Sequence, residues 1–136
     1  MRDTELKRRK AEAIYCVYKK GLEEGRFSSM REAGEWVRVQ PAPCYFISAE
    51  KASEQVGMIL SGVSLMDLND SQRRKIWRLY KEYKNFLAEH PGTKLSRDRI
   101  MESIVDRPAP EFYMTAEGIR KVLRTHIKEV RRKRGW

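Results

Sequence analysis

The stretch Gln40-Pro41-Ala42-Pro43-Cys44-Tyr45-Phe46-Ile47-Ser48-Ala49-Glu50 returns later in the chain as Arg107-Pro108-Ala109-Pro110-Glu111-Phe112-Tyr113-Met114-Thr115-Ala116-Glu117. Two prolines separated by one residue exclude a helix at that point, because proline lacks an amide hydrogen and pushes the preceding residue into extended conformations. In both copies a hydroxyl residue, an alanine and a glutamate follow, which predicts the capped start of a new helix. Each copy is therefore expected to connect two helices.

The aromatic pair in this connector allows two interpretations. It could stack on bases or grip a partner peptide, as aromatic side chains do in recognition loops. It could instead fill the core between the two helices that the connector joins. Tyr45 corresponds to Phe112 and Phe46 to Tyr113, so hydrophobic character is kept while the residue changes. This pattern favours the structural interpretation.

The repeat extends well beyond the connector. From residue 8 to residue 24 the offset is 65 and 8 of 17 positions are identical, and from residue 25 to residue 60 the offset is 67 and 8 of 36 are identical. Chance matching would give roughly one position in fifteen. The two extra residues fall near His90-Pro91, in an expected loop, where insertions are tolerated. The sequence thus predicts a tandem duplication, with repeat one at 1–60, a linker at 61–70 and repeat two at 71–136.

Each repeat is expected to contain three helices, because apolar residues recur at the helical spacing of one buried stripe. In repeat one the predicted helices span about 4–24, the residues that follow Ser29, and 49–60. In repeat two they span about 71–89, 96–105 and 116–134. The predicted fold class is all-α, with the two three-helix units packed on each other about a pseudo-twofold axis.

Composition limits the classes of protein that fit. The chain has 136 residues, no apolar run of transmembrane length and no signal-peptide pattern at its charged start. Cys16 and Cys44 lie in repeat one, and their counterparts are Lys81 and Glu111, so the cysteines do not form a disulfide framework. These features predict a cytoplasmic protein without a membrane partner.

The net charge of +10 is unevenly distributed. Residues 1–67 carry 11 Lys and Arg against 10 Asp and Glu, whereas residues 68–136 carry 18 against 9. Such an asymmetry predicts that one half faces a polyanion, and nucleic acid is the commonest polyanion in a cell. The alternative is a basic surface that only keeps the protein in solution.

The last predicted helix is the strongest candidate for the binding surface. It carries Arg120, Lys121, Arg124, Lys128, Arg131, Arg132, Lys133 and Arg134 around an apolar stripe. The corresponding helix of repeat one has Lys51 as its single Lys or Arg, so the exposed face has been recharged while the stripe is kept. Each cation that neutralises a phosphate adds salt-dependent affinity. The alternative is a solvated helix end whose cations suit the helix dipole.

Six further cations are expected to widen this basic surface: Arg73, Arg74, Lys75, Arg78, Lys81 and Lys84. The first three match Arg8, Arg9 and Lys10 of repeat one. Because both repeats have them, they are also candidates for a shared structural role.

Catalytic, cofactor and metal motifs are not found. His90 and His126 lack cysteine or carboxylate partners at ligand spacing, and His126 lies on an apolar stripe, as a core or boundary residue does. Phosphate-binding glycine loops and hydrolase motifs are also missing from the sequence. The sequence therefore predicts a protein that is not an enzyme and needs no cofactor.

Three helices with a basic third one resemble a duplicated helix-turn-helix DNA-binding domain. The resemblance implies that Arg120, Lys121 and Arg124, near the start of the third helix, face the major groove. The segment of about 39–47 between the second and third helices is longer than the usual short turn, which departs from that family. The doubled connector also resembles small bacterial or mobile-element proteins.

The predicted function is non-enzymatic DNA binding, in regulation or in a phage or mobile-element process. RNA binding uses the same charges and stays open. The alternative is a protein-interaction or assembly module that docks a partner through repeat one and the connector aromatics. The sequence does not indicate the oligomeric state.

Overall fold

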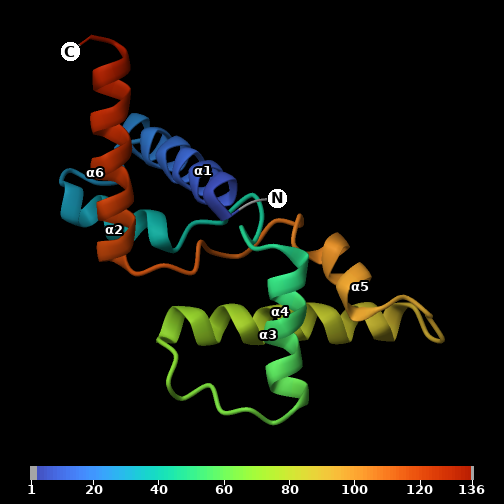
Figure 1. Cartoon of the computed structure of the whole chain (residues 1–136). Coiled ribbons are helices and arrows are strands. Elements are labelled where there is room, and N and C mark those ends of the chain that lie inside the picture. The colour runs from blue at the N-terminus through green and yellow to red at the C-terminus, as the bar shows by residue number, and fades with distance from the viewer. Residues whose placement is uncertain (1–2, 136) are drawn as a thin grey trace.

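The computed structural model describes residues 3–135 and forms six helices (Figure 1). Their bounds are α1 Asp3–Glu23, α2 Met30–Arg38, α3 Ala49–Leu60, α4 Asp70–Glu89, α5 Arg97–Ile104 and α6 Ala116–Lys133. Within the described residues no strand is present, so the all-α class is confirmed. None of the helices in this part of the chain is both long and apolar enough to cross a membrane.

Side-chain caps explain where five of the helices begin. Ser29, Ser48, Ser96 and Thr115 each accept a hydrogen bond from the backbone amide three residues later. Asn69 does the same for α4. The side-chain oxygen of Gln72 in turn accepts a hydrogen bond from the Asn69 amide, which completes a capping box. The caps at residues 48 and 115 confirm the helix starts predicted after the two connectors.

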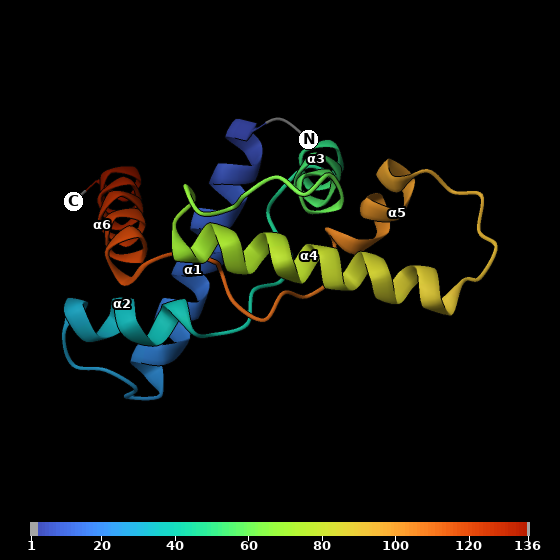
Figure 2. The same ribbon diagram turned by 90° about the horizontal axis from the view of Figure 1, so that it is seen from below.

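The helices group differently in space from their order in the sequence. α1 and α2 pack with α6, whereas α4 and α5 pack with α3 (Figures 1 and 2). The ring of Tyr15 on α1 lies 4.6 Å from the ring of His126 on α6. Arg97 on α5 donates a 2.9 Å hydrogen bond to the hydroxyl of Ser53 on α3. The third helix of each predicted repeat is therefore exchanged, and each three-helix group draws on both 1–60 and 71–136.

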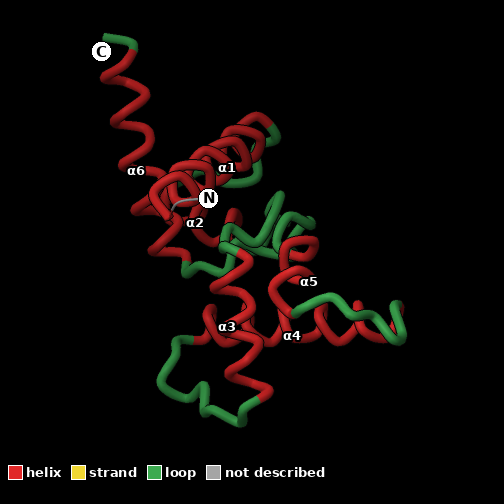
Figure 3. The backbone as a smooth tube through the Cα atoms, turned by 45° about the vertical axis from the view of Figure 1, so that its right-hand side comes forward, coloured by secondary structure: helices red, strands yellow, loops and turns green. Residues whose placement is uncertain are grey.

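The exchange requires the two connectors to cross, and they do so at the two alanines. The amide of Ala42 donates to the Ala109 carbonyl at 2.9 Å, and the amide of Ala109 donates back to the Ala42 carbonyl at 2.9 Å. Each alanine is flanked by prolines, so it carries the single amide donor of its Pro-Ala-Pro unit. The pairing consequently stays a single bridge and does not grow into a sheet. Figure 3 shows both connectors as non-helical segments between the two groups of helices.

The connector aromatics form the centre of the molecule. The Tyr45 ring stacks on that of Tyr113 with centroids 6.2 Å apart, and the Phe46 ring stacks on that of Phe112 at 6.3 Å. Tyr45 is 3% exposed and Phe112 is 2% exposed. Phe46 and Tyr113 adopt left-handed backbone conformations, with φ of 52° and 56°, which bulky residues rarely do. Dense packing at the crossing holds this strain, and the structural interpretation of the connector is the one that fits.

Side-chain size matches the exchanged helices to their partners. Gly34 on α2 lies under α6, where an added Cβ would come 2.7 Å from the Ala116 carbonyl and 2.8 Å from the stem of Arg120. In the other group the sizes are reversed, because Arg97 on α5 lies over Ser53 and Gly57 on α3. A small residue thus meets a large one at both interfaces.

Candidate nucleic-acid interface

One side of α6 is buried and the opposite side is basic. Ile119 and Leu123 have no exposed surface and pack against the group formed with α1 and α2. His126 lies partly buried against Tyr15, which places it at the boundary of the core as predicted. Packing of this side fixes the rotation of α6 and determines which residues face the solvent.

The exposed side of α6 carries a row of cations. Arg124, Lys128 and Arg131 follow the i, i+4, i+7 spacing that aligns side chains on one helix face. Six exposed cations make no ion pair or side-chain hydrogen bond with any described residue: Arg124, Lys128, Arg131, Arg132, Lys133 and Arg134. They span about 15 Å at the helical rise, and Arg132, Lys133 and Arg134 lie around the C-terminal turn and not only on the face of the first three. We call these six residues the α6 cation row.

Two predicted residues at the start of α6 are partly engaged within the protein. The Arg120 stem packs on Gly34, and its guanidinium lies 3.5 Å from the Arg31 carbonyl. Lys121 is exposed and lies 3.9 Å from the carboxylate of Glu117, one turn earlier. Arg120 therefore helps to hold α6 on α2, and Lys121 is the more accessible of the two.

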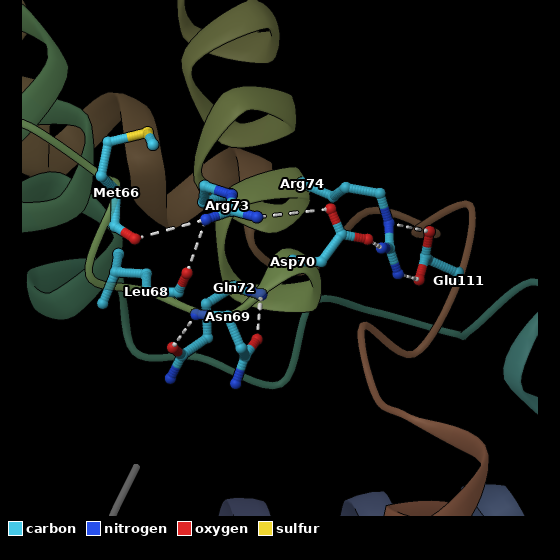
Figure 4. Close-up of polar contacts among 8 residues, drawn as sticks. All are labelled: Met66, Leu68, Asn69, Asp70, Gln72, Arg73, Arg74 and Glu111. Carbon is cyan, nitrogen blue, oxygen red and sulfur yellow. Dashed lines mark hydrogen bonds and ion pairs between the residues drawn. The ribbon is translucent and has the colours of Figure 1, made fainter.

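Arg73 and Arg74 have structural roles at the start of α4, as Figure 4 shows. Arg73 donates a 2.8 Å hydrogen bond to the Leu68 carbonyl and so ties the preceding loop to the helix. Arg74 donates through two nitrogens to the carboxylate of Glu111, at 3.1 and 2.7 Å, and also pairs with Asp70. The hydrogen bonds that Arg74 donates to Glu111 raise the pKa of Arg74. This forked pair fixes the second connector against α4.

Lys75 lies partly buried between the two groups of helices. Burial, together with the nearby charge of Lys10, lowers the pKa of Lys75 to about 8, while Cys44 acts in the opposite direction. Burial also lowers the pKa of Lys10. The predicted cations are thus not one surface, because the α6 row is exposed while Arg73, Arg74 and Lys75 belong to the scaffold.

Helix exchange concentrates positive charge in one group. Helices α1, α2 and α6 together carry 15 Lys and Arg against 8 Asp and Glu, whereas α3, α4 and α5 carry 9 against 7. The basic helix α6 is therefore presented on α1 and α2, which lie at the other end of the sequence. The C-terminal turns of α6 extend past α1 in Figure 1, so the row is open to a large partner.

A second surface beside α4 was predicted only in part, because the sequence reasoning included Arg78 and Lys81 in the wider basic surface but missed Trp77 and the groove. A groove of about 540 Å³ lies between α4 and the second connector, and it is lined by Asp70, Arg73, Arg74, Trp77, Arg78, Lys81, Glu111 and Tyr113. Trp77 is 53% exposed. The signal was present in the repeat, since the counterparts of Trp77, Arg78 and Lys81 in the first copy are Glu12, Ala13 and Cys16.

Among the described residues, no group of three or more His, Cys, Asp or Glu side chains is arranged so that it could hold a metal ion. Comparisons with models of protein families, with curated proteins and with solved structures give no match for this chain. The candidate site therefore depends on its own geometry.

Proposed function

We propose that the protein is a non-enzymatic DNA-binding protein and that the α6 cation row is its contact surface. The observation that carries the proposal is the exposure of six cations on one projecting helix with no acidic partner among the described residues. Unpaired cations bind phosphate without first breaking an internal ion pair. Each phosphate that they neutralise releases counterions, which drives association at low salt.

The proposed contact places α6 against the major groove or along one phosphate backbone. The major groove of B-DNA admits an α-helix, and arginine reads guanine through two hydrogen bonds. Arg124 is the first α6 arginine without an internal contact, so it replaces Arg120 as the proposed base-reading residue. In the helix-turn-helix resemblance, α6 takes the place of the third helix although it comes from the other repeat.

The test compares two variants of equal charge. The first replaces Arg124, Lys128 and Arg131 with alanine, and the control replaces Lys20, Lys84 and Lys94, which are exposed on other elements. Binding to duplex DNA is measured over a salt series. For the first variant the slope of log K against log salt is expected to fall by about 2 to 3, because each phosphate contact contributes roughly 0.9. The control is expected to retain the wild-type slope.

Equal slopes in both variants would count against the α6 surface and leave only a general effect of net charge. A parallel titration with double-stranded RNA separates the two nucleic acids, because A-form RNA has a deep, narrow major groove that excludes a helix. Equal affinity for both would limit the contact to the phosphate backbone. For the alternative of protein docking through repeat one and the connector aromatics, Tyr45, Phe112 and Tyr113 are buried at the crossing and Phe46 is partly buried, so the aromatics offer little surface to a partner.

We also infer that a three-helix unit was duplicated, with repeats at 1–60 and 71–136. Supporting this, features recur at the same spacing of 67 residues: the helix caps at 29 and 96 and at 48 and 115, and the left-handed residues at 25 and 92 and at 46 and 113. The reciprocal bridge of Ala42 and Ala109 pairs two equivalent positions. Such pairing is expected at a pseudo-twofold axis.

A further inference from the structure

The groove beside α4 combines an exposed aromatic side chain with cations. Trp77 has more than half of its surface exposed. In the described structure, no other tryptophan or phenylalanine of α4 or α6 is exposed to that extent. Arg73, Arg78 and Lys81 lie one residue or one helical turn from it along α4. A large aromatic side chain on the charged side of an amphipathic helix leaves much of its apolar surface in contact with water, where a partner can cover it.

The walls of the groove are held in place. Arg74 forms its forked pair with Glu111 across the groove, at 2.7 and 3.1 Å, so α4 and the second connector are joined. Tyr113 lines the connector wall with a left-handed backbone and stacks on Tyr45 behind it. The Trp77 ring is itself buttressed edge-on by Tyr80 at 5.8 Å. A ligand therefore meets a preformed surface, which lowers the entropy lost on binding.

Charge indicates what the ligand is. The lining has four cations and two carboxylates, and Glu111 and Asp70 are already paired with Arg74. Lys81 is exposed and makes no ion pair with any described residue, whereas Arg78 pairs with Glu82 at 3.3 Å and also interacts with Tyr45, which raises the pKa of Arg78. The open positions thus favour an anionic group next to a flat ring. A nucleotide offers both, because its base stacks on aromatic side chains while its phosphate binds cations.

We propose that this groove binds an unpaired nucleotide of a single-stranded segment, with the base stacked on Trp77 and the adjacent phosphate against Lys81 and Arg78. This inference rests on the proposed nucleic-acid function and adds single-stranded segments to it. The protein then holds duplex DNA through the α6 cation row and an unpaired region through the α4 groove. The first repeat lacks this site, since Glu12, Ala13 and Cys16 occupy the equivalent positions.

The test uses the full chain with Trp36 and Trp136 replaced by phenylalanine, so that Trp77 is the single tryptophan emitter. An oligothymidylate strand is expected to quench the Trp77 emission. In the wild-type background, Trp77→Ala is expected to weaken binding of this strand about 5- to 150-fold, and Trp77→Phe should retain most of the affinity. Binding of a blunt duplex should be unchanged in both. Leu95→Ala, which removes a similarly exposed apolar side chain elsewhere, is the matched control.

Unaltered strand affinity in Trp77→Ala, or unaltered emission on strand binding, would overturn the inference while leaving the α6 proposal intact. Loss of duplex binding in the α6 triple variant, with strand binding to Trp77 preserved, would support both sites separately. If the wild type fails to bind duplex DNA, the proposed function fails, and the Trp77 titration still decides the groove. Equal quenching by polyglutamate would identify an acidic polypeptide surface and overturn the nucleotide assignment.

Discussion

At the scale of single residues, the surroundings of a cation decide whether it binds a ligand or supports the fold. Arg74 and Arg124 have the same side chain and lie on helices of the same repeat. Arg74 is held by Glu111 and Asp70, whereas Arg124 faces solvent without a described partner. The sequence could predict the apolar stripe that orients α6 and hence the exposure of Arg124. It could not predict Glu111 as the partner of Arg74, because the two are 37 residues apart.

Lys75 gives a prediction at this scale. Its pKa is about 8 in the folded protein and about 10.4 in an unfolded chain. Between these values the unfolded chain binds more protons, so the free energy of unfolding rises with pH in that window. Below pH 8 Lys75 is charged in the folded protein, and its buried charge lowers the free energy of unfolding by the full amount. Lys75→Met is therefore expected to raise the free energy of unfolding at pH 7 by about 1–3 kcal/mol. Urea unfolding at several pH values measures this.

The advantage of the Met variant should shrink as pH rises from 8 to 10, because the wild-type lysine loses its proton in that range. Lys84→Met, on the exposed side of the same helix, is the control and should show neither effect. Lys10 and Cys44 lie close enough to Lys75 to influence its charge, and both variants retain them. A constant difference between Lys75→Met and wild type across the range would contradict the assignment.

At the scale of helices, size and charge complementarity explain why the third helices are exchanged. Without exchange, Arg97 would face Arg120 and Arg124, which occupy the positions equivalent to Ser53 and Gly57. Ala52 and Val56 would likewise replace Ile119 and Leu123 against the small residues of α2. One group would be crowded with like charges and the other would be underpacked, and both conditions destabilise a core. The exchanged arrangement pairs small with large in each group.

A double-mutant cycle tests this pairing of helices. Arg97→Met and Ser53→Ala are expected to show a coupling energy of about 0.5–2 kcal/mol, because they remove the two ends of one hydrogen bond. Arg97→Met and Arg120→Met should be additive, since α5 and α6 make no contact in the described structure. Free energies of unfolding for the single and double variants give both values. Coupling with Arg120 in place of Ser53 would show that each repeat packs on itself.

At the scale of the whole molecule, local signals were sufficient for the elements but not for their grouping. Proline geometry, caps and apolar periodicity predicted five helices within about a residue or two at both ends, and the start of the sixth, α2, after Ser29. The exchange depends on contacts between residues far apart in sequence, such as Tyr15 with His126, and periodicity does not encode them. The repeat itself contained the missing information. The small residues Gly34 and Ser53 of the first copy correspond to the large residues Met101 and Arg120 of the second, so exchange pairs a small residue with a large one in each group. Likewise, Trp77 stands out only beside its counterpart Glu12.

The exchange also predicts how the chain behaves when it is cut. A protease site inserted between Gly62 and Val63 lies in the exposed loop of α3 and α4, where insertions are tolerated. After cleavage, α3 remains packed on α4 and α5, and α6 remains packed on α1 and α2, so two crossed connectors still join the halves. The two fragments are expected to elute together at the mass of the intact chain and to keep its helical circular dichroism.

Each fragment purified alone should lose much of that signal, because its first two helices lack their matched third helix, and mixing should restore it. Fragments that separate in native buffer and each stay helical would instead show that the repeats fold independently. The continuous core, which runs through both groups and the connector aromatics, argues for the joined outcome.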